Sequence, residues 1–444
     1  MKQYSGIEIN GMEEWLEKVK KTTKGQDVKN LEKLTRDGIT IPLISMNDVE
    51  NQKDEHTKDF FIDSTQPQLW MSSKYLNEKF EGVDIFVSEE KTSDDYVNVK
   101  ELRSEARVAG QAYHLISTYP LHQSGVPVQY ELAFIFSAVE EWIRERKPFF
   151  TTKSERLLIH LPTDQHFITE IAKFDSLRNG LYTIFSEEGF STFPGIIITS
   201  PSTRRWSSLD HEMNLLRLTN SVTLAALSGI GTIHTIPYDE FSVKGASKRG
   251  IRLARTIPYL VWEEARLLPS TYATDSWTIK EVSEKIYELS WDIYHCIEEN
   301  GGVSCWIQNQ EQEELCLKYQ AKTAEDVLEG RVKLVGSNIY FTNLMNQFPL
   351  STTEFRWSDK LEQWQGKMHS VTYSLSKELS AEDAKQITTI FHLFGLKKVE
   401  TEFANLHVQD YINNQLTLVI NKKVRNIPVV STLQLIETIW KELA

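Results

Sequence analysis

Residues 157–199 read LLIHLPTDQHFITEIAKFDSLRNGLYTIFSEEGFSTFPGIIIT, and this stretch decides the expected fold. It begins with the apolar run Leu157–Leu161 and ends with the apolar, β-branched run Gly195–Thr199. Between them, Asp164–Phe185 has apolar residues at helical spacing. A strand, a helix and a second strand in this order predict a βαβ unit with parallel strands.

The same alternation continues on both sides, from about residue 60 to about residue 340, and predicts an α/β fold with a parallel sheet. The other expected strands are Gln68–Met71, Val83–Val87, Tyr113–Ser117 and Thr232–Ile236. The other expected helices are Val128–Arg144, Glu212–Ser228, Ala246–Leu267 and Thr278–Glu299, the last of which should end at Gly301-Gly302.

Changes in composition divide the chain into three expected parts. Residues 1–59 form an N-terminal arm and linker, because Ser45–Asp59 is polar and has little to bury. Residues 60–342 form the α/β unit. Residues 343–444 form a C-terminal extension of unknown role, with an expected helix over Ser380–Phe394, a strand over Leu416–Ile420 and a helix over Thr432–Leu443.

Charge and hydropathy exclude several classes of partner. The 444 residues include 62 acidic and 49 basic ones, giving a net charge of −13 without a long basic run, so we expect no nucleic-acid partner. No apolar run reaches the 18 residues that would span a membrane, and the N-terminus turns acidic. We therefore expect no membrane association and a cytoplasmic location.

Metal binding and common nucleotide or hydrolase motifs are not expected. Cys296, Cys305 and Cys316 lack the C-x-x-C spacing of zinc and redox sites, so they should be reduced thiols. His211-Glu212 begins like a zinc-binding H-E-x-x-H, but Leu215 takes the place of the second histidine. The sequence also contains neither G-x-x-x-x-G-K-[ST] nor G-x-S-x-G.

A longer set of motifs over Asp210–Gly302 resembles the methylmalonyl-CoA mutase family in order and spacing. The matching segments are Asn214-Leu-Leu-Arg217, Thr232-Ile-His234-Thr, Asp239-Glu240, Ile251-Arg252-Leu-Ala-Arg255-Thr, Trp262-Glu263-Glu264 and Ile297-Glu-Glu-Asn-Gly301-Gly302. Upstream, Ile116–Gly125 is similar to I-S-G-Y-H-M-x-x-A-G, and Glu170–Phe174 is similar to E-I-A-K-[FY]. The resemblance implies a TIM (β/α)₈-type barrel. Because the stretch between Trp70 and Tyr113 is short, the barrel could be an abbreviated one.

Departures from the family pattern indicate that this chain is not catalytic alone. Pro120 stands where the family has the histidine of G-Y-H-M, and proline can neither donate a hydrogen bond nor exchange a proton. Ser202-Thr203-Arg204-Arg205 falls on the family's Q-T-S-G loop. Asp164-Gln-His166 begins like the D-x-H-x-x-G loop of cobalamin domains, but Thr169 replaces its glycine, and a helix N-cap by Thr163 or Asp164 explains it better. We therefore expect neither a cobalamin domain nor a cofactor bound by this chain.

The resemblance then implies a non-catalytic small subunit of a heterodimeric mutase, an isomerase of the intramolecular type. A partner large subunit would bind adenosylcobalamin and interconvert methylmalonyl-CoA and succinyl-CoA. Residues 1–43 look like the arm with which such small subunits wrap the partner. The residues of this arm that we expect to contact the partner are Trp15, Ile41, Pro42 and Leu43.

Two alternatives remain open from the sequence. One is a vestigial pocket at the barrel mouth that binds an acyl-CoA or another anion, lined by Tyr119, His122, Lys173, Arg204, Arg205 and His234. Against it stands the expectation that these cations form internal ion pairs with Asp239, Glu240 and Glu263. The other alternative is a free-standing homodimer that has lost any link to a mutase.

Overall fold

The structure is a computed structural model of the whole chain. It describes residues 19–23, 32–42, 60–61, 68–71, 100–108, 111–146, 156–242, 244–269, 273, 276–340, 356–368, 371–376, 379–394, 396–399, 404, 406–412, 415–420, 423–428 and 431–443.

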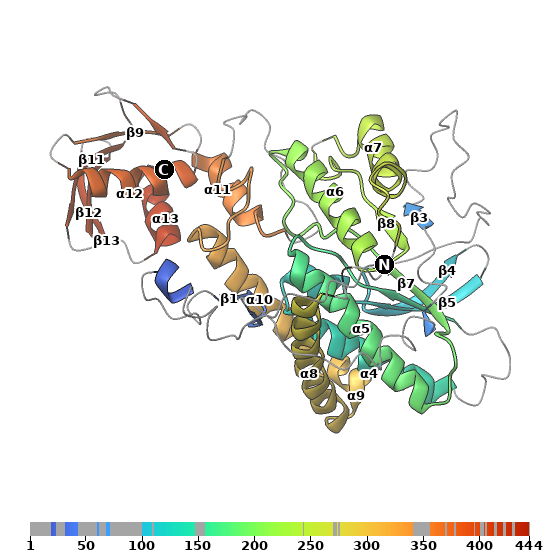
Figure 1. The fold of residues 1–444 in the computed structure, drawn as a ribbon. Helices are drawn as coiled ribbons and strands as arrows, with labels where there is room; N and C mark the ends of the chain where they lie inside the picture. The colour runs from blue at the N-terminus through green and yellow to red at the C-terminus, as the bar shows by residue number, and fades with distance from the viewer. Residues whose placement is uncertain are drawn as a thin grey trace.

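A mainly parallel sheet forms the centre of the larger unit (Figure 1). Its strands are β3 (Gln68–Met71), β4 (Arg103–Val108), β5 (Gln111–Ser117), β6 (Leu157–His160), β7 (Gly195–Thr199) and β8 (Thr232–Thr235). They lie in the order β3-β8-β7-β6-β5-β4, and only the β4–β5 pair is antiparallel. This confirms the predicted α/β class with a parallel sheet.

The strand order resembles that of a barrel. From β4 to β8 each strand lies beside the next in sequence, and the first parallel strand, β3, pairs with the last, β8. Within the described ranges no hydrogen bonds join β3 to β4, so these six strands form an open sheet with β3 and β4 at its edges. Five of the six strands predicted for this unit are confirmed within two residues, the sixth, Val83–Val87, lies outside the described residues, and β4 was not predicted.

Helices follow the strands as the apolar periodicity predicts. They are α3 (Tyr119–Ser124), α4 (Val128–Arg146), α5 (Phe167–Glu187), α6 (His211–Leu227), α7 (Lys248–Tyr259), α8 (Trp277–Glu299), α9 (Gly302–Gln308) and α10 (Glu311–Leu328). The predicted helix Ala246–Leu267 is shorter than expected. Pro258 lies inside its last turn, and the chain continues as a π-helical turn over Leu260–Glu264.

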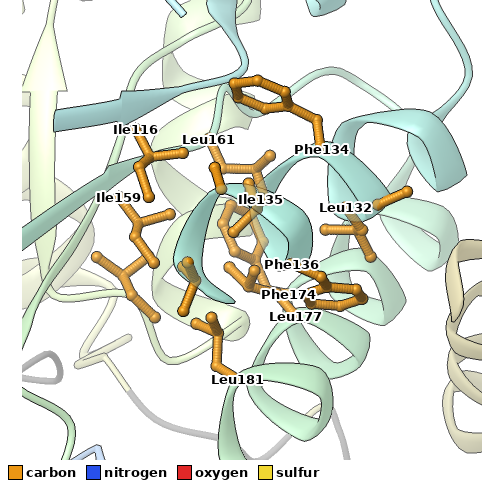
Figure 2. Packing of buried hydrophobic residues seen from close by; sticks show 14 of the residues in the cluster. Ile116, Leu132, Phe134, Ile135, Phe136, Ile159, Leu161, Phe174, Leu177 and Leu181 are labelled. Atoms are coloured by element: carbon orange, nitrogen blue, oxygen red, sulfur yellow. The ribbon is translucent and has the colours of Figure 1, made fainter. Parts of the chain in front are cut away.

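The main core lies between the sheet and the helices α4, α5 and α8 (Figure 2). Ile116 and Ile159 project from neighbouring strands toward Phe136 of α4 and Leu177 of α5. Gly180 allows this packing, because a Cβ atom there would lie 2.2 Å from the Phe136 ring. The contact between helix and ring therefore depends on the missing side chain.

The C-terminal unit has its own sheet and core (Figure 1). The sheet has the order β10-β9-β11-β12-β13, with β9 (Thr372–Leu375), β10 (Lys397–Lys398), β11 (Leu406–Ile412), β12 (Gln415–Ile420) and β13 (Lys423–Pro428). The helices α11 (Asp359–Met368), α12 (Ala381–Leu393) and α13 (Thr432–Leu443) share a hydrophobic core with this sheet. Their buried side chains pack with the end of α10, so that helix links the two units.

A short N-terminal hairpin packs on the larger unit. Its strands are β1 (Lys33–Leu34) and β2 (Thr40–Ile41). Ile39 is 2% exposed and belongs to the main core, and Ile41 packs against the same core. The backbone carbonyl of Asp37 accepts a hydrogen bond from the Gln129 side chain, 3.1 Å away. This part of the predicted arm therefore contacts its own chain.

Candidate functional site

The carboxyl ends of the parallel strands β5, β6, β7 and β8 lead into loops that meet at one edge of the sheet, where α/β proteins place their functional groups. We call this edge the mouth and define it as residues 117–122, 160–164 and 199–205. Most of its polar side chains are buried, including Ser117, His122, His160, Asp164 and Ser202. Buried polar groups require partners, and the partners determine what the mouth can do.

His160, at the end of β6, is the central residue of the mouth. Its Nδ1 lies 2.9 Å from Ser117 Oγ on β5, and its Nε2 lies 2.9 Å from Ser200 Oγ after β7. Burial, together with the charge of nearby His234, lowers the pKa of His160 well below its usual value. The imidazole is therefore neutral at pH 7, and both of its nitrogens are engaged.

His122, on α3, has the same kind of environment. Its Nδ1 lies 2.9 Å from Glu131 Oε1 on α4, and its Nε2 lies 2.9 Å from Ser202 Oγ. Burial and the nearby Arg204 lower the pKa of His122 well below its usual value. Pro120, in the first turn of α3, fits there because its missing N–H is not needed at a helix start.

Glu131 makes the stability of the mouth depend on pH. Burial raises its pKa from 4.5 to about 7. A raised carboxyl pKa means that the stability present below pH 4.5 is lost as the pH rises through 7. Relative to Glu131→Gln, the wild-type chain should lose about 3 kcal/mol of unfolding free energy between pH 4.5 and pH 8. Urea denaturation of both proteins across this range measures the difference, and a constant difference would contradict the raised pKa.

Asp164 joins the two arginines that follow β7. Its Oδ2 accepts hydrogen bonds from Arg204 Nε at 3.0 Å and Nη2 at 2.6 Å, and Arg205 Nε lies 2.9 Å from both carboxylate oxygens. Burial alone would raise the pKa of Asp164, but the charges of Arg204 and Arg205 outweigh burial and hold it well below its usual value. The carboxylate is therefore ionised and shared by two guanidiniums.

This arrangement corrects two expectations. Helix α5 begins at Phe167 and its N-cap is His166, so neither Thr163 nor Asp164 caps it. The two arginines do form internal ion pairs, as one alternative expected, but the partners expected for them were wrong. Arg204 and Arg205 both pair with Asp164. Glu263 instead lies at the surface near Arg266.

The other predicted pocket residues are placed as follows. Lys173 Nζ lies 2.5 Å from Glu170 and donates to the carbonyl of Pro162 at 2.6 Å. The Tyr119 hydroxyl lies 3.0 Å from Thr203 Oγ1. His234 is half-buried on β8 and influences His160 electrostatically. The predicted residues thus gather around the mouth, and in the described contacts most of them bind other side chains of this chain.

The segment 356–362 of the C-terminal unit covers the loop after β7. The backbone N–H of Trp357 donates to the carbonyl of Arg204 at 2.7 Å. Glu362 accepts hydrogen bonds from the Ser207 and Ser208 hydroxyls, and Ser358 Oγ donates to the carbonyl of Trp206 at 3.2 Å. Trp357 and Glu362 are buried by these contacts. The loop after β7 is therefore covered by the C-terminal unit of the same chain.

Family comparison gives the mouth its context. The family model described as Methylmalonyl-CoA mutase matches residues 107–390, which is well over half of the chain and includes the mouth and the segment 356–362. The chain belongs to the methylmalonyl-CoA mutase family. A search of curated proteins finds no match. Arg36 and the rest of the N-terminal hairpin lie outside the residues that the family model matches.

The residues that would mark a corrinoid site of the mutase family do not fit that group. Asp164 is bound by two arginines, and Arg205 Nη2 lies 3.1 Å from His166 Nε2. The His166 imidazole therefore contacts a guanidinium of this chain, whereas a histidine that holds a corrinoid would need that nitrogen free.

Within the described part of the chain, no three or more His, Cys, Asp or Glu side chains form a group that could hold a metal ion. Among the same residues, no helix combines the length and hydropathy needed to cross a bilayer.

Proposed function

We propose that this chain is the non-catalytic small subunit of a heterodimeric, cytoplasmic methylmalonyl-CoA mutase. The large subunit would bind adenosylcobalamin and interconvert methylmalonyl-CoA and succinyl-CoA, and this chain would bind no cofactor. The family match supports the mutase assignment. The state of the mouth supports the non-catalytic role.

The observation that carries the proposal is the combined state of Pro120, His122 and His160. Proline stands where the family has its histidine, and the two histidines nearby have both ring nitrogens engaged with Ser or Glu side chains. A catalytic acid or base must reach the proton that it transfers. The mouth in this conformation offers neither histidine for that purpose, which supports a structural task for the chain.

Of the four residues proposed to contact the partner, two lie within the described part of the chain. Ile41 packs against this chain's own core and Pro42 is half-buried, whereas Trp15 and Leu43 lie outside the described residues. Arg36 contacts the Trp357 ring and Ile39 lies in the main core, so both residues stabilise the fold of this chain. A truncation that tests partner binding should therefore remove residues 1–31 and keep residues 32–42.

The test is light-scattering mass measurement of the purified chain with a cobalamin-loaded large subunit from the same source. A one-to-one complex is expected, and replacing residues 1–31 by a Gly/Ser linker of equal length should weaken it by about tenfold or more, because obligate interfaces bury large apolar areas. Thermal unfolding of the linker variant checks that its own fold is intact. A chain that stays apart, or that forms only a homodimer, would overturn the proposal.

A further inference from the structure

Three guanidinium groups converge on the indole ring of Trp357. The Cζ atoms of Arg36, Arg205 and Arg204 lie 4.1, 4.4 and 4.6 Å from the ring centroid. They come from separate parts of the chain: Arg36 from the N-terminal hairpin, Arg204 and Arg205 from the loop after β7, and Trp357 from the turn before α11. Trp357 itself is 1% exposed.

In the part of the chain that the structure describes, positive charge and hydrogen-bond donors exceed their partners at this place, even though Arg204 Nη1 also donates to the carbonyl of His122 at 2.8 Å. Arg204 and Arg205 share the carboxylate of Asp164, while Arg36 donates to the Thr323 hydroxyl, which is neutral. Burial and the charges of Arg204 and Arg205 lower the pKa of Arg36 to about 10. Among the described residues, the Trp357 Nε1–H has no acceptor. Within the described residues, three guanidinium groups and the Trp357 Nε1–H therefore lie close together, and Asp164 is the carboxylate that is directly bonded to two of the guanidiniums.

Other acidic groups compensate only in part. Asp37 and Asp326 act on Arg36 through their charges, and Glu131 and Asp37 act on Arg204. Burial raises the pKa of Asp37 and brings that of Glu131 to about 7, so Glu131 loses part of its negative charge near neutral pH. Asp326 is already bonded to Arg331 at 2.7 Å.

The backbone makes room for Arg36 at this place. Gly125 ends α3 with a φ of +83°, and a Cβ atom there would lie 2.8 Å from Thr323 Oγ1 and 3.3 Å from the Arg36 guanidinium. The glycine thus permits both the left-handed turn and the close approach of α10 and the hairpin. Arg205 extends to the solvent edge, where its Nη2 meets His166.

We infer that Arg36, Arg204 and Arg205 form a binding site for a small oxyanion of the phosphate or carboxylate class, with Trp357 as its lid. Guanidinium forks match such anions with paired, charge-assisted hydrogen bonds, and the face of an indole is a weaker partner. An arriving anion would replace the ring as partner of the three cations, and Trp357 would move aside. The inference is independent of the proposed subunit role, because it concerns this chain alone.

The test is isothermal titration calorimetry of the full chain with inorganic phosphate, pyrophosphate and succinate at constant ionic strength. Saturable one-to-one binding of at least one anion is expected. Arg36→Gln and Arg205→Gln should each weaken it by about tenfold or more, because each removes a charge-assisted contact. Arg425→Gln, which removes an exposed arginine paired with Glu442 in the C-terminal sheet, should leave it unchanged.

The role of Trp357 as a lid leads to a prediction that distinguishes an anion site from a purely structural cluster. Trp357→Leu keeps an apolar but smaller side chain and removes the aromatic face, so anion affinity should rise several-fold as the competing partner is lost. Circular dichroism and thermal unfolding verify that each variant folds. Tighter binding of pyrophosphate than of succinate would assign the site to phosphate esters, and the reverse order to carboxylates.

Three outcomes would overturn the inference. One is heat that does not saturate with any of the three anions. A second is binding that Arg36→Gln and Arg205→Gln leave unchanged, which would place the ion elsewhere. The third is a loss of affinity in Trp357→Leu with the fold intact. None of these measurements uses the large subunit, so failure here is distinguishable from failure of the proposed function.

Discussion

Asp164→Asn should lower the free energy of unfolding by about 3–5 kcal/mol, which is the usual cost of removing one partner from a buried ion pair. The substitution keeps the volume of the side chain but leaves Arg204 and Arg205 without their shared carboxylate. Arg204 is 8% exposed, so water cannot replace the lost partner without movement of the loop. Urea denaturation followed by circular dichroism measures the effect.

The matched control is Glu325→Gln, which removes a carboxylate from an exposed pair with Arg331 and should cost less than about 1 kcal/mol. The effect of Asp164 also has a pH signature. Because its pKa is depressed, the stability that it contributes is present above pH 3.8 and is lost as the pH falls through the lowered value. Equal losses in the two variants would mean that the Asp164 pair is not a buried anchor.

Glu362→Gln should cost about 3 kcal/mol, because Glu362 holds the C-terminal unit on the loop after β7. Its carboxylate accepts hydrogen bonds from the hydroxyls of Ser207 and Ser208 and lies 3.5 Å from Arg356 Nη1. An amide has only one acceptor oxygen, and its NH₂ group would face Arg356 or a serine hydroxyl. Calorimetry should show a lower midpoint of thermal unfolding. In a separate experiment, limited proteolysis should cut the variant faster between the two units.

The control for this variant is Glu442→Gln, whose carboxylate pairs with Arg425 on the exposed surface of the C-terminal unit. That change should shift the stability by less than about 1 kcal/mol. If Glu362→Gln behaves like Glu442→Gln, the contact between segment 356–362 and the loop after β7 contributes little, and other contacts must join the units.

The parallel strands and their helices could be predicted because their signals are local. Gly195–Thr199 is a short apolar, β-branched run, and α8 has a clear apolar stripe that ends before Gly301. β4 was missed because its sequence, RSEARV, alternates charged with small residues and lies at the edge of the sheet. The five-stranded C-terminal sheet depends on pairing between distant segments, which periodicity does not report.

The site could be predicted only in part. The cations after β7 were found from the sequence, but their partner was sought after β8, although β6 also neighbours β7 and delivers Asp164 to the same edge. Attention to strand neighbours could have found that pair. Arg36 and Trp357 lie far away in sequence, and no local pattern connects either residue to the mouth.

The contact between Arg36 and Thr323 joins positions 287 residues apart, which has a consequence for biosynthesis. At about 5–20 residues per second, the ribosome needs on the order of half a minute between releasing Arg36 and releasing Trp357. Ile39 can be covered earlier in this interval, once the main core up to Trp306 has been synthesised. The contacts of Arg36 with Thr323 and Trp357 therefore form late in synthesis, after the core beneath the hairpin can already have folded.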